Sequence, residues 1–484
     1  MVVNNLKRLL LKILKKGLFI GPFFFFLILN LETNLVPNAQ KFLAIFSWVV
    51  SGWLFTRVPL FITGIFGVCL SIIMGVATTQ EAFGPFSNQI IFLFMGGFLI
   101  AKALEVLRFD RKIALNILTL PLIAGNFKRT IMAIYIVTAF FSMWVSNTAT
   151  TAMMLPIVLG ILNNLHLEDE KLKSTVLLGV AYSATIGGIG TPLGSPPNLI
   201  ALGFLETLVN IKIGFFQWFL FGFPLEVLFL IILYLYTIRK VPNTLERYNT
   251  EALLEEKKML PPINRHEMVV MFIFASAVTL WFSPSLLPLI IGKGHPLVSF
   301  FKTNMPAGVV SIFLASLLFM LPITERVKIL GLDDAKSIDW PSLFLFGSGL
   351  SLGGILFKTG LAEAFSNALF SGVTSESFIY ILCFLVFVTI FTTELASNTA
   401  SANILVPLVI VASTKAGFSP KIAAIAVALA CNMAFMLPVA TPPNTIIYGS
   451  GNVKLIDMVK EGFGLNLLAF VFLAVVILII SFFL

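Results

Sequence analysis

Long apolar segments recur from residue 41 almost to the end of this chain, and they constrain the fold more than any other feature. Hydrophobic residues make up 58% of the 484 residues and charged residues only 11%. Soluble proteins are about 45–50% apolar and about 25% charged, so a soluble core cannot bury this much apolar surface. Because a transmembrane helix needs about 20 apolar residues, the pattern predicts an all-α polytopic membrane protein.

Several other protein classes are excluded by simple residue patterns. The three Cys lie in apolar runs and the three His are far apart in sequence, which argues against a disulfide framework or a zinc site. The sequence has no GxxxxGK[ST] phosphate loop and no visible nucleophile–base pair, so it is not expected to be an enzyme. The net charge of +9 is interpreted as basic cytoplasmic loops rather than as a nucleic-acid interface, and no nucleic-acid partner is expected.

Charge patterning divides the chain into four parts. Residues 1–40 combine a basic, amphipathic segment with a first apolar stretch, which we interpret as a retained span rather than as a signal peptide. Residues 239–267, with six Lys/Arg and five Glu, form the expected cytoplasmic linker between a first repeat (41–238) and a second repeat (268–484). The predicted location is the cell (inner) membrane, multi-pass, with a cytoplasmic N-terminus.

Four apolar regions do not fit simple spans. The pairs 131–145/149–164 and 377–396/400–414 each turn at a short Ser-Asn-Thr tip, which predicts two re-entrant hairpins. The regions 174–208 and 420–450 are interrupted by Gly and Pro, which predicts two broken helices.

The motifs of these interrupted regions recur in the second half of the chain at nearly the same distance in sequence. Ser146-Asn147-Thr148 returns 251 residues later as Ser397-Asn398-Thr399, and Pro196-Pro197-Asn198 returns 246 residues later as Pro442-Pro443-Asn444. Paired interrupted helices in two repeats are typical of secondary transporters. If the repeats are inverted, the two tips would meet at mid-membrane from opposite sides.

The tip residues suit ion binding. Ser, Asn and Thr cap the helix that follows, whose free N–H groups and positive dipole end would face an anion without any Arg or Lys. Hydroxyls, amides and unwound carbonyls would also suit a hard cation such as Na⁺. The broken helices add Gly194-Ser195-Pro196 and Ala440-Thr441-Pro442. The alternative is that these Ser and Thr residues only join neighbouring helices.

Buried acids test whether the chain is a sodium/proton antiporter. All six Asp lie in or beside predicted loops, which disfavours an antiporter. Glu394 is either a proton or cation site or a structural acid bonded to a neighbouring helix. Glu105, Glu226 and Glu363 are interpreted as interface or paired residues.

Four motifs resemble the divalent anion/sodium symporters, which carry di- and tricarboxylates or sulfate. The motifs are SMWVSNTATTAMMLP (142–156), GGIGTPLGSPPN (187–198), TTELASNTASANILVP (392–407) and NMAFMLPVATPPNT (432–445). The resemblance implies an inverted repeat of about eleven transmembrane helices with two re-entrant hairpins and two broken helices. It also implies a homodimer whose transport domains move like elevators against a scaffold.

The resemblance further implies the binding residues, carried over by matching position. The first sodium site would use Ser142, Ser146, Asn147 and Gly194, and the second Thr393, Ala396, Asn398 and Ala440. The substrate would meet Ser146, Asn147, Thr148, Ser195, Ser397, Asn398, Thr399, Thr441 and Pro442. Pro192 is expected to stiffen the first broken stretch, because its ring removes a donor.

The expected function is transport of C4/C5-dicarboxylates (succinate, malate, fumarate, 2-oxoglutarate) across the lipid bilayer, coupled to two or more sodium ions. Sodium-independent dicarboxylate exchange, or transport of citrate or sulfate, remains the alternative.

Overall fold

The computed structural model describes residues 18–165, 169–242, 250–324, 327–370 and 372–482. The basic segment predicted over the first 16 residues and part of the 239–267 linker lie outside the described residues. The described chain is helical apart from one short antiparallel pair, β1 (Pro322–Thr324) and β2 (Val327–Lys328), so the predicted all-α class is confirmed.

The helices follow one another along the whole chain. In the first half they are Leu18–Asn30, α2 (Pro37–Phe55), α3 (Leu60–Ile73), α4 (Thr79–Phe83), the 3-10 helix η1 (Gly84–Ser87), α5 (Gln89–Val106), α6 (Phe109–Leu118), α7 (Phe127–Ser142), α8 (Asn147–Asn164), α9 (Glu170–Gly187), α10 (Pro196–Val209), α11 (Phe215–Ile238) and α12 (Glu251–Lys258). In the second half they are α13 (Arg265–Ile290), α14 (Pro296–Asn304), α15 (Ala307–Met320), α16 (Leu332–Lys336), α17 (Trp340–Lys358), α18 (Leu361–Phe370), α19 (Ser375–Leu395), α20 (Asn398–Lys415), α21 (Pro420–Cys431), α22 (Pro442–Gly449) and α23 (Leu455–Phe482).

Within the described residues, six helical segments are long and apolar enough to cross a membrane, and the bent pair α14–α15 would make a seventh. Fewer segments meet this test than the roughly eleven spans implied by the resemblance, because several apolar helices are shorter. These shorter helices include α10 and α21, which border the predicted breaks. The chain is therefore a multi-pass membrane protein whose central helices are interrupted rather than continuous.

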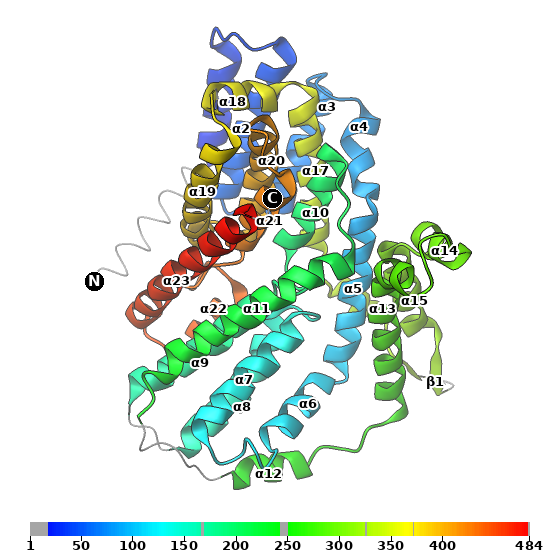
Figure 1. Ribbon diagram of the computed structural model, residues 1–484, viewed down its shortest axis with the longest axis vertical. Helices are drawn as coiled ribbons and strands as arrows, with labels where there is room; N and C mark the ends of the chain where they lie inside the picture. The colour runs from blue at the N-terminus through cyan, green and yellow to red at the C-terminus, as the bar shows by residue number, and fades with distance from the viewer. Residues whose placement is uncertain (1–17, 166–168, 243–249, 325–326, 371, 483–484) are drawn as a thin grey trace.

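The two predicted hairpins are present and enter the molecule from opposite ends. Figure 1 shows α7 and α8 in the lower part of the molecule and α19 and α20 in the upper part. The helices that follow exchange partners between repeats, because α10 packs against α20 and α22 packs against α8. This crossed packing is what an inverted repeat produces, and it brings the two tips to one place.

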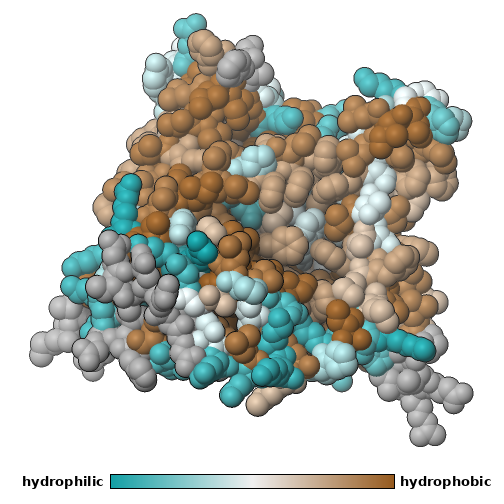
Figure 2. Space-filling view, turned by 60° about the horizontal axis from the view of Figure 1, so that its bottom comes forward, coloured by the Kyte–Doolittle hydropathy of each residue, from teal (hydrophilic) through white to brown (hydrophobic). Residues whose placement is uncertain are grey.

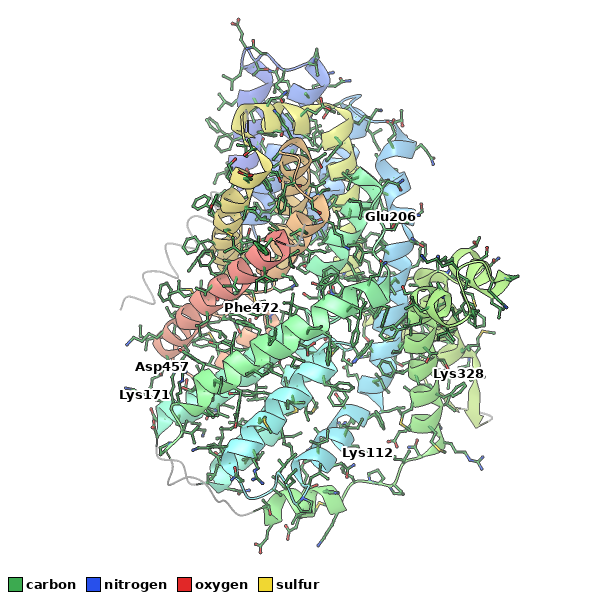
Figure 3. All side chains as sticks on the ribbon, in the orientation of Figure 1. Lys112, Lys171, Glu206, Lys328, Asp457 and Phe472 are labelled. Carbon is green, nitrogen blue, oxygen red and sulfur yellow. The ribbon has the colours of Figure 1, made fainter. Side chains whose placement is uncertain are left out.

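The outer surface matches a protein surrounded by lipid. Figure 2 shows apolar residues over most of the visible side and polar residues gathered towards the lower end. Large apolar side chains such as Phe272, Phe313 and Val471 are exposed. Figure 3 labels Lys112 in the lower part of the molecule and Lys171 and Asp457 at its left side, whereas Phe472 lies higher along α23. An apolar exterior of this kind is expected where hydrocarbon replaces water.

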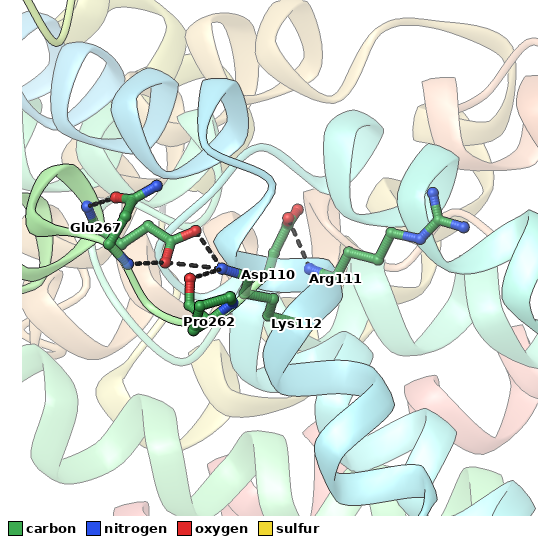
Figure 4. Close-up of polar contacts among 6 residues, drawn as sticks. Asp110, Arg111, Lys112, Pro262 and Glu267 are labelled. Carbon is green, nitrogen blue, oxygen red and sulfur yellow. Dashed lines mark hydrogen bonds and ion pairs between the residues drawn. The ribbon is translucent and has the colours of Figure 1, made fainter. Parts of the chain in front are cut away.

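The linker region is fastened to the first repeat by a buried ion pair. Lys112 on α6 donates to both carboxylate oxygens of Glu267, at 2.6 and 2.8 Å, and to the Pro262 carbonyl at 3.3 Å (Figure 4). Glu267 also accepts from the backbone N–H of Asn264 and so caps the start of α13. Removing one partner of such a pair would leave the other charge buried, which is costly. The pair therefore fixes α6, which precedes the first hairpin, against the second repeat.

The helices α5 and α15, one from each repeat, pack closely because small residues lie between them. A Cβ added at Gly96 on α5 would lie 2.6 Å from the carbonyl oxygen of Ser311 on α15. Trp281 on α13 donates to the Ser311 hydroxyl at 2.9 Å and holds this contact from outside. The two backbones thus touch directly, as they do where small residues line membrane helix interfaces.

The Gly96→Ala variant is expected to lose stability, because the added methyl group forces α5 and α15 apart. Overpacking of this kind costs about 1–3 kcal/mol. The measurement is the thermal unfolding temperature of the purified protein in detergent, which should fall by several degrees. The matched control is Gly354→Ala on α17, where nothing lies within 4 Å of an added Cβ. Equal unfolding temperatures for both variants would contradict the close packing.

Candidate functional site

The first Ser-Asn-Thr motif forms a tight helix-turn-helix tip. α7 ends at Ser142 and α8 begins at Asn147, with Ser146 at the N-cap position. The Ser146 hydroxyl accepts the N–H of Ala149 at 3.1 Å, as an N-cap serine does. The remaining N–H groups of the first turn therefore point beyond the tip.

The second motif repeats this geometry with one difference. α19 ends at Leu395 and α20 begins at Asn398, with Ser397 at the N-cap position. Within the structure described here, the Ser397 side chain makes no capping hydrogen bond. Its hydroxyl is therefore available to a ligand in the cavity that the tips border.

The Pro-Pro-Asn motifs hold the two breaks open. α9 stops at Gly187 and α10 starts at Pro196, while α21 stops at Cys431 and α22 starts at Pro442. Asn198 donates its amide to the carbonyls of Gly188 and Thr191, both at 2.8 Å. Asn444 donates to the carbonyls of Ala434 and Leu437, at 3.2 and 3.0 Å. Each Asn thus satisfies carbonyls that a continuous helix would have bonded itself.

Pro192 lies within the first break, where it disturbs no helix. The neighbouring Thr191 carries the local hydrogen bonds instead, since its hydroxyl donates to the Met143 carbonyl at 2.6 Å and accepts the Gly194 N–H at 3.2 Å. This threonine therefore ties the break to the first hairpin tip.

All nine residues predicted to meet a substrate line one cavity of about 370 Å³. These residues are Ser146, Asn147, Thr148, Ser195, Ser397, Asn398, Thr399, Thr441 and Pro442. Gly194 and Ala440, predicted as sodium ligands, also line this cavity. Ser142, Thr393 and Ala396 do not line it and are buried behind the two tips.

Besides α17, whose N-cap residue Asp339 lines this cavity, four described helices from the tips and breaks begin there. Their N-cap residues are Ser146 for α8, Ser195 for α10, Ser397 for α20 and Thr441 for α22, and all four line it. Each helix places a partial positive charge at its N-terminus, and α8 and α20 also present free N–H groups. The helices α10 and α22 begin with Pro-Pro, which has no N–H to donate, so they contribute their dipoles and the N-cap residues Ser195 and Thr441. The tips and breaks supply this positive potential without any Lys or Arg of their own, which suits an anion with two or more acceptor groups.

Behind each tip, three oxygens converge around a single hydroxyl hydrogen. The Ser142 hydroxyl lies 2.6 Å from Asn147 Oδ1 and 2.6 Å from the Ala184 carbonyl oxygen. The Thr393 hydroxyl lies 2.6 Å from Asn398 Oδ1 and 2.9 Å from the Cys431 carbonyl oxygen. One hydrogen cannot satisfy both acceptors fully, so each cluster suits a hard cation such as Na⁺.

The remaining members of the first cluster are also close. A Cβ added at Gly188 would lie 3.0 Å from the Asn147 amide nitrogen and 3.1 Å from the Gly194 carbonyl oxygen. The structure thus brings Asn147 and Gly194 together around Gly188, as the matched positions imply.

Sequence reasoning missed three groups of residues around the site. The carbonyls of Ala184 and Cys431 complete the oxygen clusters, but a backbone group leaves no mark on residue type. Asn432 links the breaks, because its amide bonds Asn198 and Ser195 across the repeats at 2.9 and 2.5 Å. The opposite cavity wall carries Lys102 and Asp339 from α5 and the start of α17, and Glu105, predicted as an interface or paired residue, pairs there with Lys102 at 3.0 Å. Only the charge of these last residues, next to apolar runs, could have drawn attention to them.

Of the two roles predicted for Glu394, its surroundings are those of a structural acid bonded to a neighbouring helix. Its carboxylate accepts the backbone N–H groups of Phe435, Met436 and Leu437 at 2.6, 2.8 and 3.0 Å. The amide of Asn466 on α23 donates a fourth hydrogen bond at 2.7 Å. Four donors compensate the buried charge and hold the second break in place.

Comparisons with known proteins agree with this architecture. Residues 13–483 match the family described as the sodium:sulfate symporter transmembrane region. An uncharacterized transporter of Haemophilus influenzae is 35% identical over 93% of each chain. The sodium-dependent dicarboxylate transporters SdcS of Staphylococcus saprophyticus and Staphylococcus aureus (strain USA300) are each 32% identical, over 95% of this chain and 90% of theirs.

A solved structure shares the fold at low sequence identity. The YdaH transporter of Alcanivorax borkumensis superposes with a TM-score of 0.56 at 12% identity, covering 86% of this chain and 88% of that one. The interrupted, repeated helices around one polar cavity define a secondary transporter. The chain belongs to the divalent anion/sodium symporter family, and it is a transporter rather than an enzyme.

The Glu394→Gln variant is expected to loosen the second break, because an amide replaces two charged acceptor oxygens with one neutral acceptor and a donor. Hydrogen bonds to charged groups are worth about 1.5–3 kcal/mol each. Hydrogen–deuterium exchange should become faster at residues 435–437 and the unfolding temperature should fall. The control is Glu376→Gln, an exposed acid on the same helix. Unchanged exchange at residues 435–437 would contradict the bracing role.

Proposed function

We propose that this protein is a secondary active transporter of C4/C5-dicarboxylates such as succinate, malate, fumarate and 2-oxoglutarate, coupled to sodium. The observation that carries the proposal is the cavity at which four helix N-termini and both Ser-Asn-Thr tips meet. The names of the staphylococcal relatives, sodium-dependent dicarboxylate transporters, point to the same substrate class.

The two-fold arrangement suits a substrate with two separated carboxylates. One carboxylate would accept from the tip at Ser146–Thr148 and from Thr441 of the second break. The other would accept from the tip at Ser397–Thr399 and lie against Ser195 of the first break, whose hydroxyl donates to Asn432 at 2.5 Å. Because the free N–H groups of α8 and α20, the four helix dipoles and the tip hydroxyls contribute together, the negative charge is spread over several groups instead of being paired with a basic side chain.

Sodium would occupy the two oxygen clusters behind the tips. Ser142, Ser146, Asn147 and Gly194 would hold one ion, and Thr393, Ala396, Asn398 and Ala440 the other. Two sodium ions offset the two charges of the substrate, and burial of an uncompensated charge near the bilayer centre costs at least several kcal/mol. The domain would therefore cross the membrane readily only when it carries both the ions and the dicarboxylate, or neither.

We propose an elevator mechanism in a homodimer for this movement. The hairpins, breaks, α11 and α23 form the transport domain, built from the repeats 41–238 and 268–484. The other long helices, among them α5 and α15, form the scaffold and the dimer interface. The basic linker 239–267 faces the cytoplasm together with the N-terminus, as the positive-inside rule favours.

Uptake of labelled succinate into proteoliposomes tests the proposed function. An inward sodium gradient should drive uptake into empty vesicles, and replacement of sodium by potassium should abolish it. The variants Asn147→Ala and Asn398→Ala should each lose at least nine-tenths of uptake while remaining folded. Uptake that needs internal dicarboxylate and ignores sodium would instead show an exchanger. Full transport by both variants would contradict the assigned site.

The sodium clusters have a separate test in the hydroxyl that each contains. Ser142→Ala removes one oxygen ligand, and a loss of about 1.4 kcal/mol corresponds to a tenfold weaker affinity. The sodium concentration for half-maximal uptake should therefore rise about tenfold. Thr393→Ser keeps its hydroxyl and should stay near wild type. Thr138→Ala is the matched control, since its buried hydroxyl only bonds Ile134 within α7. An equal rise in Thr138→Ala would refute the assignment.

A further inference from the structure

Glu226 is a buried acid in the middle of a membrane-spanning helix, and it lacks the compensation that such a charge needs. Its side chain, on α11, is 3% exposed. Within the described part of the chain, no residue forms a hydrogen bond or ion pair with Glu226, and Oε2 is fully buried without a partner. Of the two roles predicted for Glu226, interface or paired residue, the paired role is therefore wrong. An unpaired carboxylate here is costly unless a cation neutralises it.

Glu226 packs directly against the first break. A Cβ added at Gly190 would overlap Glu226 Oε2, so the carboxylate rests on the backbone of this glycine. One turn earlier, a Cβ at Gly222 would lie 2.7 Å from the Ile189 carbonyl oxygen and 3.0 Å from that of Gly190. Trp218 donates to the Ile189 carbonyl at 3.0 Å. This face of α11 therefore supports the break that borders the cavity.

The second repeat contains an equivalent contact between a long helix and a break, and there the polar side chains are hydrogen-bonded. The sequence Gly222-Phe-Pro-Leu-Glu226 on α11 corresponds to Gly462-Phe-Gly-Leu-Asn466 on α23. A Cβ at Gly462 would overlap the Phe435 carbonyl, so α23 supports the second break as α11 supports the first. There, Asn466 donates to Glu394, which also accepts three backbone N–H groups.

In the first repeat these roles are rearranged. Met143 precedes its Ser-Asn-Thr tip by three residues, as Glu394 precedes the other tip, so a methionine occupies the place of the bonded acid. The acid stands instead at the place of Asn466, on α11. Each repeat thus has one acid beside its break, but no described residue donates to Glu226 as four groups donate to Glu394.

Charged side chains on the neighbouring helices lie elsewhere. The helices α7, α9, α13 and α23 pack against α11, and their charged residues are confined to their first two turns. These residues are Lys128 and Arg129; Glu170, Lys171 and Lys173; Arg265, His266 and Glu267; and Asp457, Lys460 and Glu461. Of the tyrosines, Tyr135 contacts Thr237, eleven residues beyond Glu226, and Tyr182 packs on Phe435. Glu226, level with the end of α9, faces none of these charges.

We propose that Glu226 binds a proton from one side of the membrane and releases it on the other during the transport cycle. A proton is favoured over a metal ion because Oε2 touches Gly190 and because the hydroxyls and amides that form the sodium clusters are not found beside it. The carboxylate is neutral while the loaded domain moves, and it releases its proton when the break opens to water. It stays ionised and hydrated through the open break while the empty domain returns, so each cycle moves one net positive charge inward. This inference rests on the proposed function and adds one proton to each sodium-coupled cycle.

Proton movement into proteoliposomes tests the proposal. Vesicles hold a pH-sensitive dye at pH 7.5, where succinate is the dianion, and potassium with valinomycin clamps the potential at zero. An inward sodium gradient with succinate should acidify the lumen in wild type, by one proton per succinate. Glu226→Gln should retain sodium-driven succinate uptake but lose at least nine-tenths of the acidification. Glu226→Asp should retain acidification, and the control Glu206→Gln should behave as wild type.

The outcomes separate this inference from the function on which it rests. Succinate uptake without acidification in wild type, or equal acidification in Glu226→Gln, overturns the proton site and leaves the transporter intact. A sodium-to-succinate ratio that falls by one in Glu226→Gln, without proton movement in wild type, would show a sodium site and also overturns it. Absence of sodium-driven succinate uptake in wild type would contradict the proposed function itself. If Glu226→Gln fails to fold, absence of acidification in wild type still overturns the proton site.

Discussion

The structure depends on satisfying exposed backbone groups inside an apolar body. Two helices break and two hairpins turn where no bulk water would be expected to pair their free N–H and C=O groups, each of which is costly when unpaired. The chain meets this constraint with polar side chains that have no charge at the tips, and with Asn198 and Asn444 at the breaks. The groups left over point into the cavity, which is the proposed binding site.

The two repeats solve the same problem in different ways. The second break is held by a carboxylate that accepts from four donors. The first break relies on Thr191, Asn198 and the packing of α11, and beside it lies an acid without donors. The repeat symmetry accounts for the paired tips and clusters. The acids differ between the repeats, because Glu394 accepts four hydrogen bonds and Glu226 accepts none from the described residues. Coupling to ions can thus be unequal across a symmetric site.

Much of this site could be predicted from residue types, and the reason is local. Ser-Asn-Thr and Pro-Pro-Asn fix their own turn geometry, so their repetition at a nearly constant offset identified the tips and the breaks before any contact was known. The structure brings all nine predicted substrate residues to one cavity. What could not be predicted depends on residues far apart in sequence. Glu394 and Glu226 look alike as isolated acids, and only the positions of Asn466 and the backbone of residues 435–437 distinguish them. The wall formed by Lys102 and Asp339 likewise depends on how α5 and α17 pack.

The central claim is that both tips hold one dicarboxylate together, with a cation behind each tip. A cryo-electron microscopy map of the purified protein in sodium and succinate tests this most directly. The account predicts density for one elongated molecule between Ser146–Thr148 and Ser397–Thr399, with a smaller peak beside Ser142 and another beside Thr393, and none of the three when choline replaces sodium. Succinate bound outside this cavity, or bound in it equally well without sodium, would contradict the account.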